Sequence, residues 1–139
     1  HYNNNPNNGG KYGKLYNWYA VNDPRGLAPE GWHVPSDWEW RLLTDYIGDH
    51  IFSGRKLKAQ FDWSENGEGT DEFCFTALPG GKRDSSGTFY NIGNYGFWWS
   101  STECSSSDAW YRHLYSGAGY VSSRKTSKQD GFSVRCIKV

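Results

Sequence analysis

The chain has 139 residues, which is enough for one domain with a sizeable core. Its 15 basic and 15 acidic residues cancel to a formal net charge of zero, which argues against a protein that binds nucleic acid or an anionic membrane surface. Aromatic residues make up 18% of the chain, which argues against disorder, and no run approaches the roughly 18 apolar residues of a membrane span.

The N-terminal part of the chain has the composition of a loop followed by a strand. Residues 1–10 are mostly asparagine, glycine and proline, so we expect an N-terminal loop there. Residues 11–21 are dense in Tyr, Trp, Leu and Val and predict a strand, which a turn at 22–26 ends. Because the chain starts at His1 and contains no methionine, we expect an excised domain or a processed fragment.

The clearest local signal predicts a helix over residues 37–47. Ser36 is a suitable N-cap, Glu39 completes a capping box, and Gly48 suits the position just after the helix. Apolar residues recur at helical spacing within this segment. A shorter helix is expected within residues 53–59, with its cations on a solvated face.

The second half of the chain predicts short strands joined by turns. The expected strands are 88–90 paired with 97–99, then 109–115, 119–122 and 132–138. In the last of these, Phe132, Val134 and Cys136 share one face. The acidic segment 60–72 lacks the spacing of an EF-hand loop, so we expect ordinary loop acidity and no metal site. Helices followed by strands indicate the α+β class.

Six ordered motifs resemble the Fibrobacter succinogenes major paralogous domain, from about Tyr2 to Cys136: GKLYNWYAV, GWHVPSDWEW, ALPGG, GFWWSSTE, AWYRHL and GFSVRC. The resemblance implies a single domain over 1–139 with a C-type lectin-like fold of the α+β class. In such a fold one or two helices pack on small antiparallel sheets with long loops, and the two chain ends meet in one sheet.

The resemblance also implies a location and a mode of use. Relatives are mostly secreted or lipid-anchored surface proteins of Bacteroidetes-type bacteria and their phages, so we expect an extracellular or cell-surface protein. The anchor would be a lipid on a preceding segment, or the domain would sit on a phage particle. Some domains of this type are variable proteins of diversity-generating retroelements, in which the C-terminal part is mutated to make new ligand surfaces.

Two departures from the family pattern concern the cysteines and the sugar site. Many relatives carry a Cys before the Pro-x-Gly-Trp-His motif, where this chain has Ala28, so Cys136 lacks its usual partner. Cys74 or Cys104 would have to replace that partner; we favour a buried free thiol at Cys136. No CxxC pair is present, so a thiolate metal site is not expected. The calcium and sugar signature of lectins is also absent, so the fold name does not imply carbohydrate binding.

The region 96–139 is expected to be displayed, with its GFWW and GFSVRC ends in the core and a middle part, roughly 103–128, on the surface. Trp98 and Trp110 are expected in the core with the apolar residues of the last strand. The middle part is rich in Tyr, Ser and Gly, the chemistry that antibody loops use for binding. The residues expected to face a ligand are Glu103, Ser105, Ser107, Tyr111, His113, Tyr115, Ser116, Tyr120, Ser122 and Arg124.

Three of these residues allow a geometric prediction. Tyr111, His113 and Tyr115 are spaced by two, so they would share one face of a strand. His33, within the GWHVP motif, is expected to bond a backbone group rather than to act in catalysis. We therefore expect a non-enzymatic domain for ligand binding or adhesion, without cofactor or metal, whose partner is an external protein or glycan. The alternatives are a structural module of a larger surface protein and an enzyme related to the formylglycine-generating enzymes.

Overall fold

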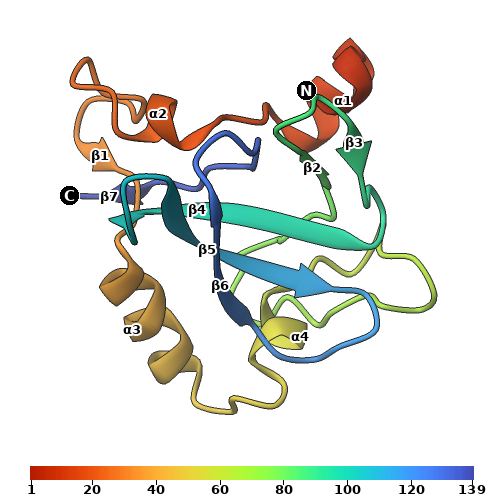
Figure 1. The fold of residues 1–139 in the computed structure, drawn as a ribbon. Helices are drawn as coiled ribbons and strands as arrows, with labels where there is room; N and C mark the ends of the chain where they lie inside the picture. The colour runs from red at the N-terminus through yellow and green to blue at the C-terminus, as the bar shows by residue number, and fades with distance from the viewer.

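All helices lie in the first half of the chain, and all strands except one lie in the second half, in the computed structural model, which describes all of residues 1–139 (Figure 1). A 3₁₀ turn at Tyr2–Asn4 precedes the helices α1 (Pro6–Tyr12), α2 (Trp18–Val21), α3 (Asp37–Ile47) and α4 (Ser53–Leu57). The strands are β1 (Trp32–His33), β2 (Lys82–Arg83), β3 (Phe89–Tyr90), β4 (Tyr95–Glu103), β5 (Asp108–Tyr115), β6 (Ser122–Ser127) and β7 (Ile137–Lys138). This arrangement confirms the α+β class. No helix combines the length and the apolar character needed to cross a membrane.

Three small antiparallel sheets organise the chain. The largest has the strand order β4-β5-β6, and the other two pair β1 with β7 and β2 with β3. In the largest sheet Tyr95 lies opposite Tyr115 and Trp99 lies opposite Tyr111. Because side chains alternate along a strand, this register decides which residues share each face of the sheet.

The helix α3 forms where its end signals predict. The Ser36 side chain accepts a hydrogen bond from the Glu39 backbone N–H, and the Glu39 carboxylate accepts one from the Ser36 backbone N–H. At the other end Gly48 has a φ of 83°, a left-handed conformation that glycine adopts without steric cost. The predicted helix 37–47 is confirmed, as is a short helix, α4, within 53–59.

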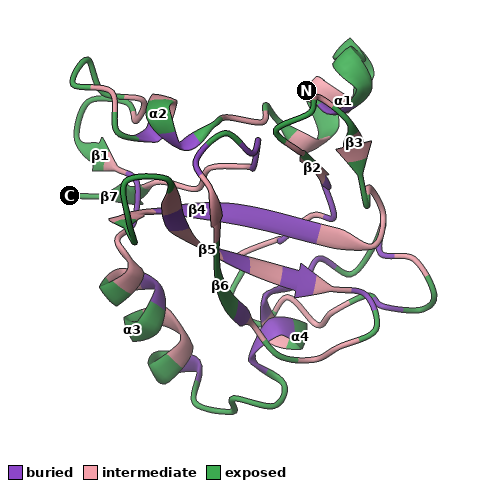
Figure 2. Cartoon of the chain, in the orientation of Figure 1, coloured by how far each residue is buried: buried purple, intermediate pink, exposed green.

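The three-stranded sheet separates two hydrophobic clusters, and β4 is buried along most of its length (Figure 2). On one face, Trp99 packs with Trp18 of α2 and with Phe132. On the other face, Trp98 and Leu114 pack against residues of α3 and α4. The expected core positions Trp98 and Phe132 are therefore buried.

The N-terminal predictions were wrong. The expected loop 1–10 contains most of α1, because the Asn5 side chain caps the helix by accepting from the Asn7 backbone N–H and Pro6 takes the first helical position. The expected strand 11–21 ends in α2, where the Asn17 side chain accepts from the Ala20 backbone N–H. In both places an asparagine cap starts a short helix.

Several strand predictions also need correction. The strand 88–90 pairs with β2 and not with 97–99, because β5 occupies one edge of β4 and bridges to Gly81 and Ser133 occupy the other. The strand expected at 119–122 starts only at Ser122, since the Gly119 carbonyl accepts from the Arg55 N–H of α4. Of the expected strand 132–138, only residues 137–138 form a strand, β7, which pairs with β1. At the start of the expected strand, Phe132 forms an isolated bridge with Tyr16 of the N-terminal segment.

Candidate functional site

A row of half-buried aromatic side chains lies on one face of β4 and β5. It consists of Tyr95, Tyr111, His113 and Tyr115, and we call it the aromatic strip. The register confirms that the three residues from β5 share a face: Tyr115 lies opposite Tyr95, and His113 lies opposite Phe97. The strip therefore combines two neighbouring strands.

The rings of the aromatic strip contact one another directly. Tyr95 stacks on Tyr115 with ring centroids 4.5 Å apart and an interplanar angle of 19°. The His113 ring lies 5.6 Å from Tyr95 and 5.9 Å from Tyr111. Contacts at these distances are favourable for aromatic pairs, so each ring restricts the rotamers of the next.

A fully buried layer supports the strip from below. Phe132 and Trp99 are both 0% exposed, and the Phe132 ring lies 4.7 Å from Tyr111 and 4.4 Å from Trp99. The Trp99 indole N–H donates to the Tyr16 carbonyl at 2.8 Å, which ties this layer to the N-terminal segment. The strip is thus held by packing rather than by loop conformation.

Two cations flank the strip without a carboxylate partner. Burial lowers the pKa of His113, and the nearby charges of Arg124 and Lys82 lower it further. The Lys82 ammonium lies 5.6 Å from the Phe97 ring centroid, and neither Lys82 nor Arg124 takes part in an ion pair. The His113 Nδ1 atom is buried and has no hydrogen-bond partner. Burial also raises the pKa of Tyr111, so its hydroxyl stays protonated.

The expected ligand residues spread along the whole length of β5 rather than forming one patch. Glu103, Ser105 and Ser107 are exposed at the β4–β5 turn, where the Ser105 hydroxyl accepts from the Ser107 N–H and Glu103 forms an ion pair with Lys128. Tyr120 lies in the β5–β6 loop, beyond the other end of β5. An eight-residue strand spans roughly 25 Å, so the two ends are too far apart to contact one small ligand.

Two of the expected ligand residues are buried, which contradicts the prediction. Ser116 is 7% exposed, and its backbone and side chain both donate to Asn94, at the backbone carbonyl and at Oδ1. Ser122 is 8% exposed and lies opposite His113 in the sheet. Trp110, expected in the core, is only half-buried; it lies on the face of β5 opposite to Tyr111, where it lines a cavity.

Lys58 is buried, although the cations of residues 53–59 were expected on a solvated face. Lys58 is 2% exposed, and its ammonium donates to the carbonyls of Tyr115 and Ala118 and lies 4.9 Å from the Trp63 ring centroid. Burial, with a smaller effect from Arg55, lowers the pKa of Lys58 to about 8. This buried cation fixes the start of the β5–β6 loop.

The whole sequence identifies the family of the chain. The family model of the Fibrobacter succinogenes major domain matches residues 1–138. The chain belongs to this family. No curated protein and no solved structure shows a significant match, so the C-type lectin-like fold of this Fibrobacter succinogenes major domain stays a prediction.

Other candidate reactive side chains of this Fibrobacter succinogenes major domain are its three cysteines and His33. All three cysteines are free, and burial raises the pKa of the half-buried Cys136, which disfavours the thiolate form. Cys74 and Cys136 line one groove of about 330 Å³. His33 bonds the Glu39 carboxylate at 2.6 Å, and not a backbone group as expected. No group of three or more His, Cys, Asp or Glu side chains is placed to hold a metal ion.

Proposed function

We propose that this domain is a non-enzymatic binding module that holds an external protein or glycan on its aromatic strip. The observation that carries the proposal is the strip itself: four half-exposed rings in mutual contact, over a fully buried aromatic layer. Rigid aromatic side chains offer a large contact area at a low cost in conformational entropy.

The charges around the strip indicate which ligand groups it would favour. Arg124 and Lys82 are unpaired, and each is close enough to His113 to lower its pKa. A ligand would therefore place hydrogen-bond acceptors or acidic groups at the cations and a flat or apolar face on the rings. The exposed turn residues Glu103, Ser105 and Ser107 would contact only a partner large enough to cover the whole sheet.

The test is a binding screen of the purified domain on immobilised glycans and bacterial and host surface proteins, followed by matched variants. Tyr115→Ser with Arg124→Ser should weaken binding to any confirmed partner by at least about tenfold, since both a ring contact and a charge are lost. The control is Tyr19→Ser with Arg25→Ser, which changes the same residue types on a distant exposed surface. Equal losses in both double variants, or no loss in the first, would contradict the proposal.

We further propose that the domain acts outside a bacterial cell or on a phage particle, with any lipid anchor supplied by a preceding segment. Diversification by a retroelement is a separate proposal. It requires, in the parent genome, a reverse transcriptase gene and a near-identical template repeat that differs from the gene only at adenines. Sequencing the flanking DNA decides this point without affecting the binding proposal.

A structural module is the second candidate, and one observation favours it. The expected ligand residues are divided among the β4–β5 turn, the strip and the β5–β6 loop, and two of them are buried. A module without its own ligand would show no partner in the screen. It would also tolerate the Tyr115→Ser and Arg124→Ser changes in the parent protein without loss of surface attachment.

A further inference from the structure

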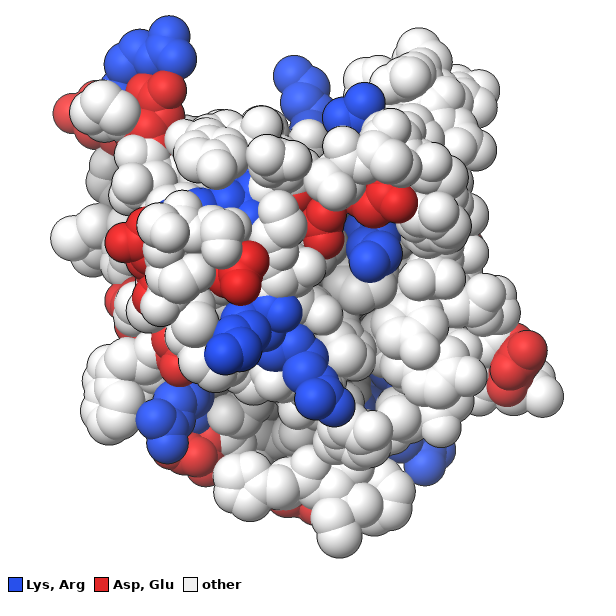
Figure 3. Space-filling view, viewed as in Figure 1, with Lys and Arg blue, Asp and Glu red and all other residues white.

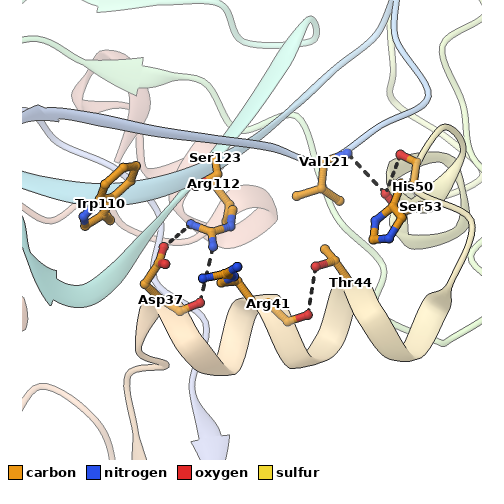
Figure 4. A pocket seen from close by; sticks show the side chains of 9 residues that line it. All are labelled: Asp37, Arg41, Thr44, His50, Ser53, Trp110, Arg112, Val121 and Ser123. Carbon is orange, nitrogen blue, oxygen red and sulfur yellow. Dashed lines mark hydrogen bonds and ion pairs between the residues drawn. The ribbon is translucent and has the colours of Figure 1, made fainter.

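The face of β5 opposite to the aromatic strip lines a cavity of about 390 Å³. Figure 4 shows the side chains that line it. The cavity lies between α3 and the sheet, where the even-numbered residues of β5 point away from the strip. Its lining residues are Asp37, Arg41, Thr44, His50, Ser53, Trp110, Arg112, Val121 and Ser123. Only two of the nine are hydrophobic, so the cavity suits a polar ligand.

A buried arginine forms one wall of this cavity. Arg112 is 3% exposed, and its guanidinium donates to the Asp37 carboxylate at 2.6 Å and to the Asp37 carbonyl at 3.3 Å. Asp37 therefore neutralises Arg112 and fixes the orientation of its guanidinium. The guanidinium N–H groups that these two bonds do not use remain available to a ligand.

Arg41 brings a second positive charge to the same cavity, and nothing neutralises it. Its guanidinium forms no hydrogen bond and no ion pair, and Figure 4 shows it pointing from α3 toward the Arg112 side of the cavity. With Asp37 paired to Arg112, the cavity carries one net positive charge when His50 is neutral. Figure 3 shows Lys and Arg side chains gathered near the middle of the side of the molecule that Figure 1 turns toward the viewer, beside a hollow in the surface.

Some of the other lining side chains already form hydrogen bonds within the protein, and others form none. The Thr44 hydroxyl donates to the Arg41 carbonyl at 2.9 Å, and the Ser53 hydroxyl donates to the His50 carbonyl at 3.3 Å. The side chains of His50 and Ser123 form no hydrogen bond, and both are exposed. The half-buried indole of Trp110 closes one end (Figure 4).

From these groups we propose that the cavity binds an acidic sugar residue. One net positive charge matches a monoanion, and a guanidinium binds a carboxylate through paired N–H donors. His50 and Ser123 would bond sugar hydroxyls, and the Trp110 ring would cover the apolar face of the sugar. A cavity of about 390 Å³ is of the size that small-molecule sites use.

The experiment is an NMR titration of the ¹⁵N-labelled domain with glucuronate, with glucose as the uncharged match and acetate as the bare carboxylate. Glucuronate should shift the amide signals near Arg41, Thr44 and Ser123 and the indole signal of Trp110. Glucose should leave them unchanged, and acetate should bind at least about tenfold more weakly than glucuronate.

Variants separate this site from the aromatic strip. Arg41→Gln should weaken glucuronate binding by at least about tenfold, because it removes the only unpaired guanidinium that lines this cavity, whereas Arg124→Gln on the other face should leave it unchanged. Arg41 is exposed, so the variant should keep its folded spectrum. The proposal is overturned if glucuronate causes no shift, if glucose or acetate binds equally well, or if Arg41→Gln binds like the unaltered protein. None of these outcomes bears on the aromatic strip, whose ligand is tested with Tyr115 and Arg124.

Discussion

Replacing Phe132 by alanine should remove a large part of the stability of the domain. Phe132 is 0% exposed, and its ring lies 5.1 Å from Phe97, 4.4 Å from Trp99 and 4.7 Å from Tyr111. Core Phe→Ala changes cost about 3–5 kcal/mol, and each aromatic pair adds about 0.5–1.5 kcal/mol beyond its buried area. The neighbours cannot collapse into the cavity, because the Trp99 indole is bonded to the Tyr16 carbonyl. We therefore expect the upper end of this range, about 5 kcal/mol.

Equilibrium urea unfolding followed by tryptophan fluorescence measures this change. A loss of about 5 kcal/mol is a third or more of the stability of a typical domain and should lower the Tm by about 20 °C. The matched control is Phe73→Ala, because Phe73 is 38% exposed; it should cost no more than about 1.5 kcal/mol. A loss below about 2 kcal/mol for Phe132→Ala would show that the buried layer under the strip is not rigid, and the argument for a preformed strip would fail.

Three further changes test other parts of the structure. The pKa of His113 lies below its ordinary value of 6.5, so its contribution to stability is full above that pH and falls as the pH drops below it. The free energy of unfolding of His113→Gln should therefore depend less on pH between 7.5 and 5.5 than that of the unaltered protein. An unchanged pH dependence would contradict this. Lys58→Met removes the donor to two loop carbonyls. It should lower the free energy of unfolding by about 2 kcal/mol and speed amide hydrogen exchange in residues 116–120. Lys56→Met is the control and should do neither. Ser36→Ala removes the cap of α3 and should cost about 1 kcal/mol in urea unfolding, with the exposed Ser85→Ala as a neutral control.

The features that the sequence predicts well are those that residues close together in the chain decide. The helix α3 follows from a capping box and a C-terminal glycine that lie within 13 residues of one another, from Ser36 to Gly48, so no distant contact is needed. The shared face of Tyr111, His113 and Tyr115 follows from the alternation of a single strand. These predictions were confirmed because neighbouring residues decide them.

The predictions that failed depend on partners far along the chain. The two-residue strands β2 and β3 exist because they pair with each other, and the pairing of β4 is decided by β5. The burial of Ser116 depends on Asn94, and that of Lys58 on the carbonyls of Tyr115 and Ala118. The cavity beside α3 likewise requires Arg41 and Arg112, which are 71 residues apart, to meet across a helix and a sheet.

The alternation of β5 also limits how this segment can vary. Its odd-numbered residues supply the aromatic strip, and its even-numbered residues supply Arg112 and Leu114 to the opposite side. Deleting or inserting one residue would exchange the two sets, so that Arg112 would face the buried layer of Phe132 and Trp99. Substitutions at the odd positions leave the other face intact. Functional variants of this strand should therefore differ in composition while keeping a constant length between the β4–β5 turn and the β5–β6 loop.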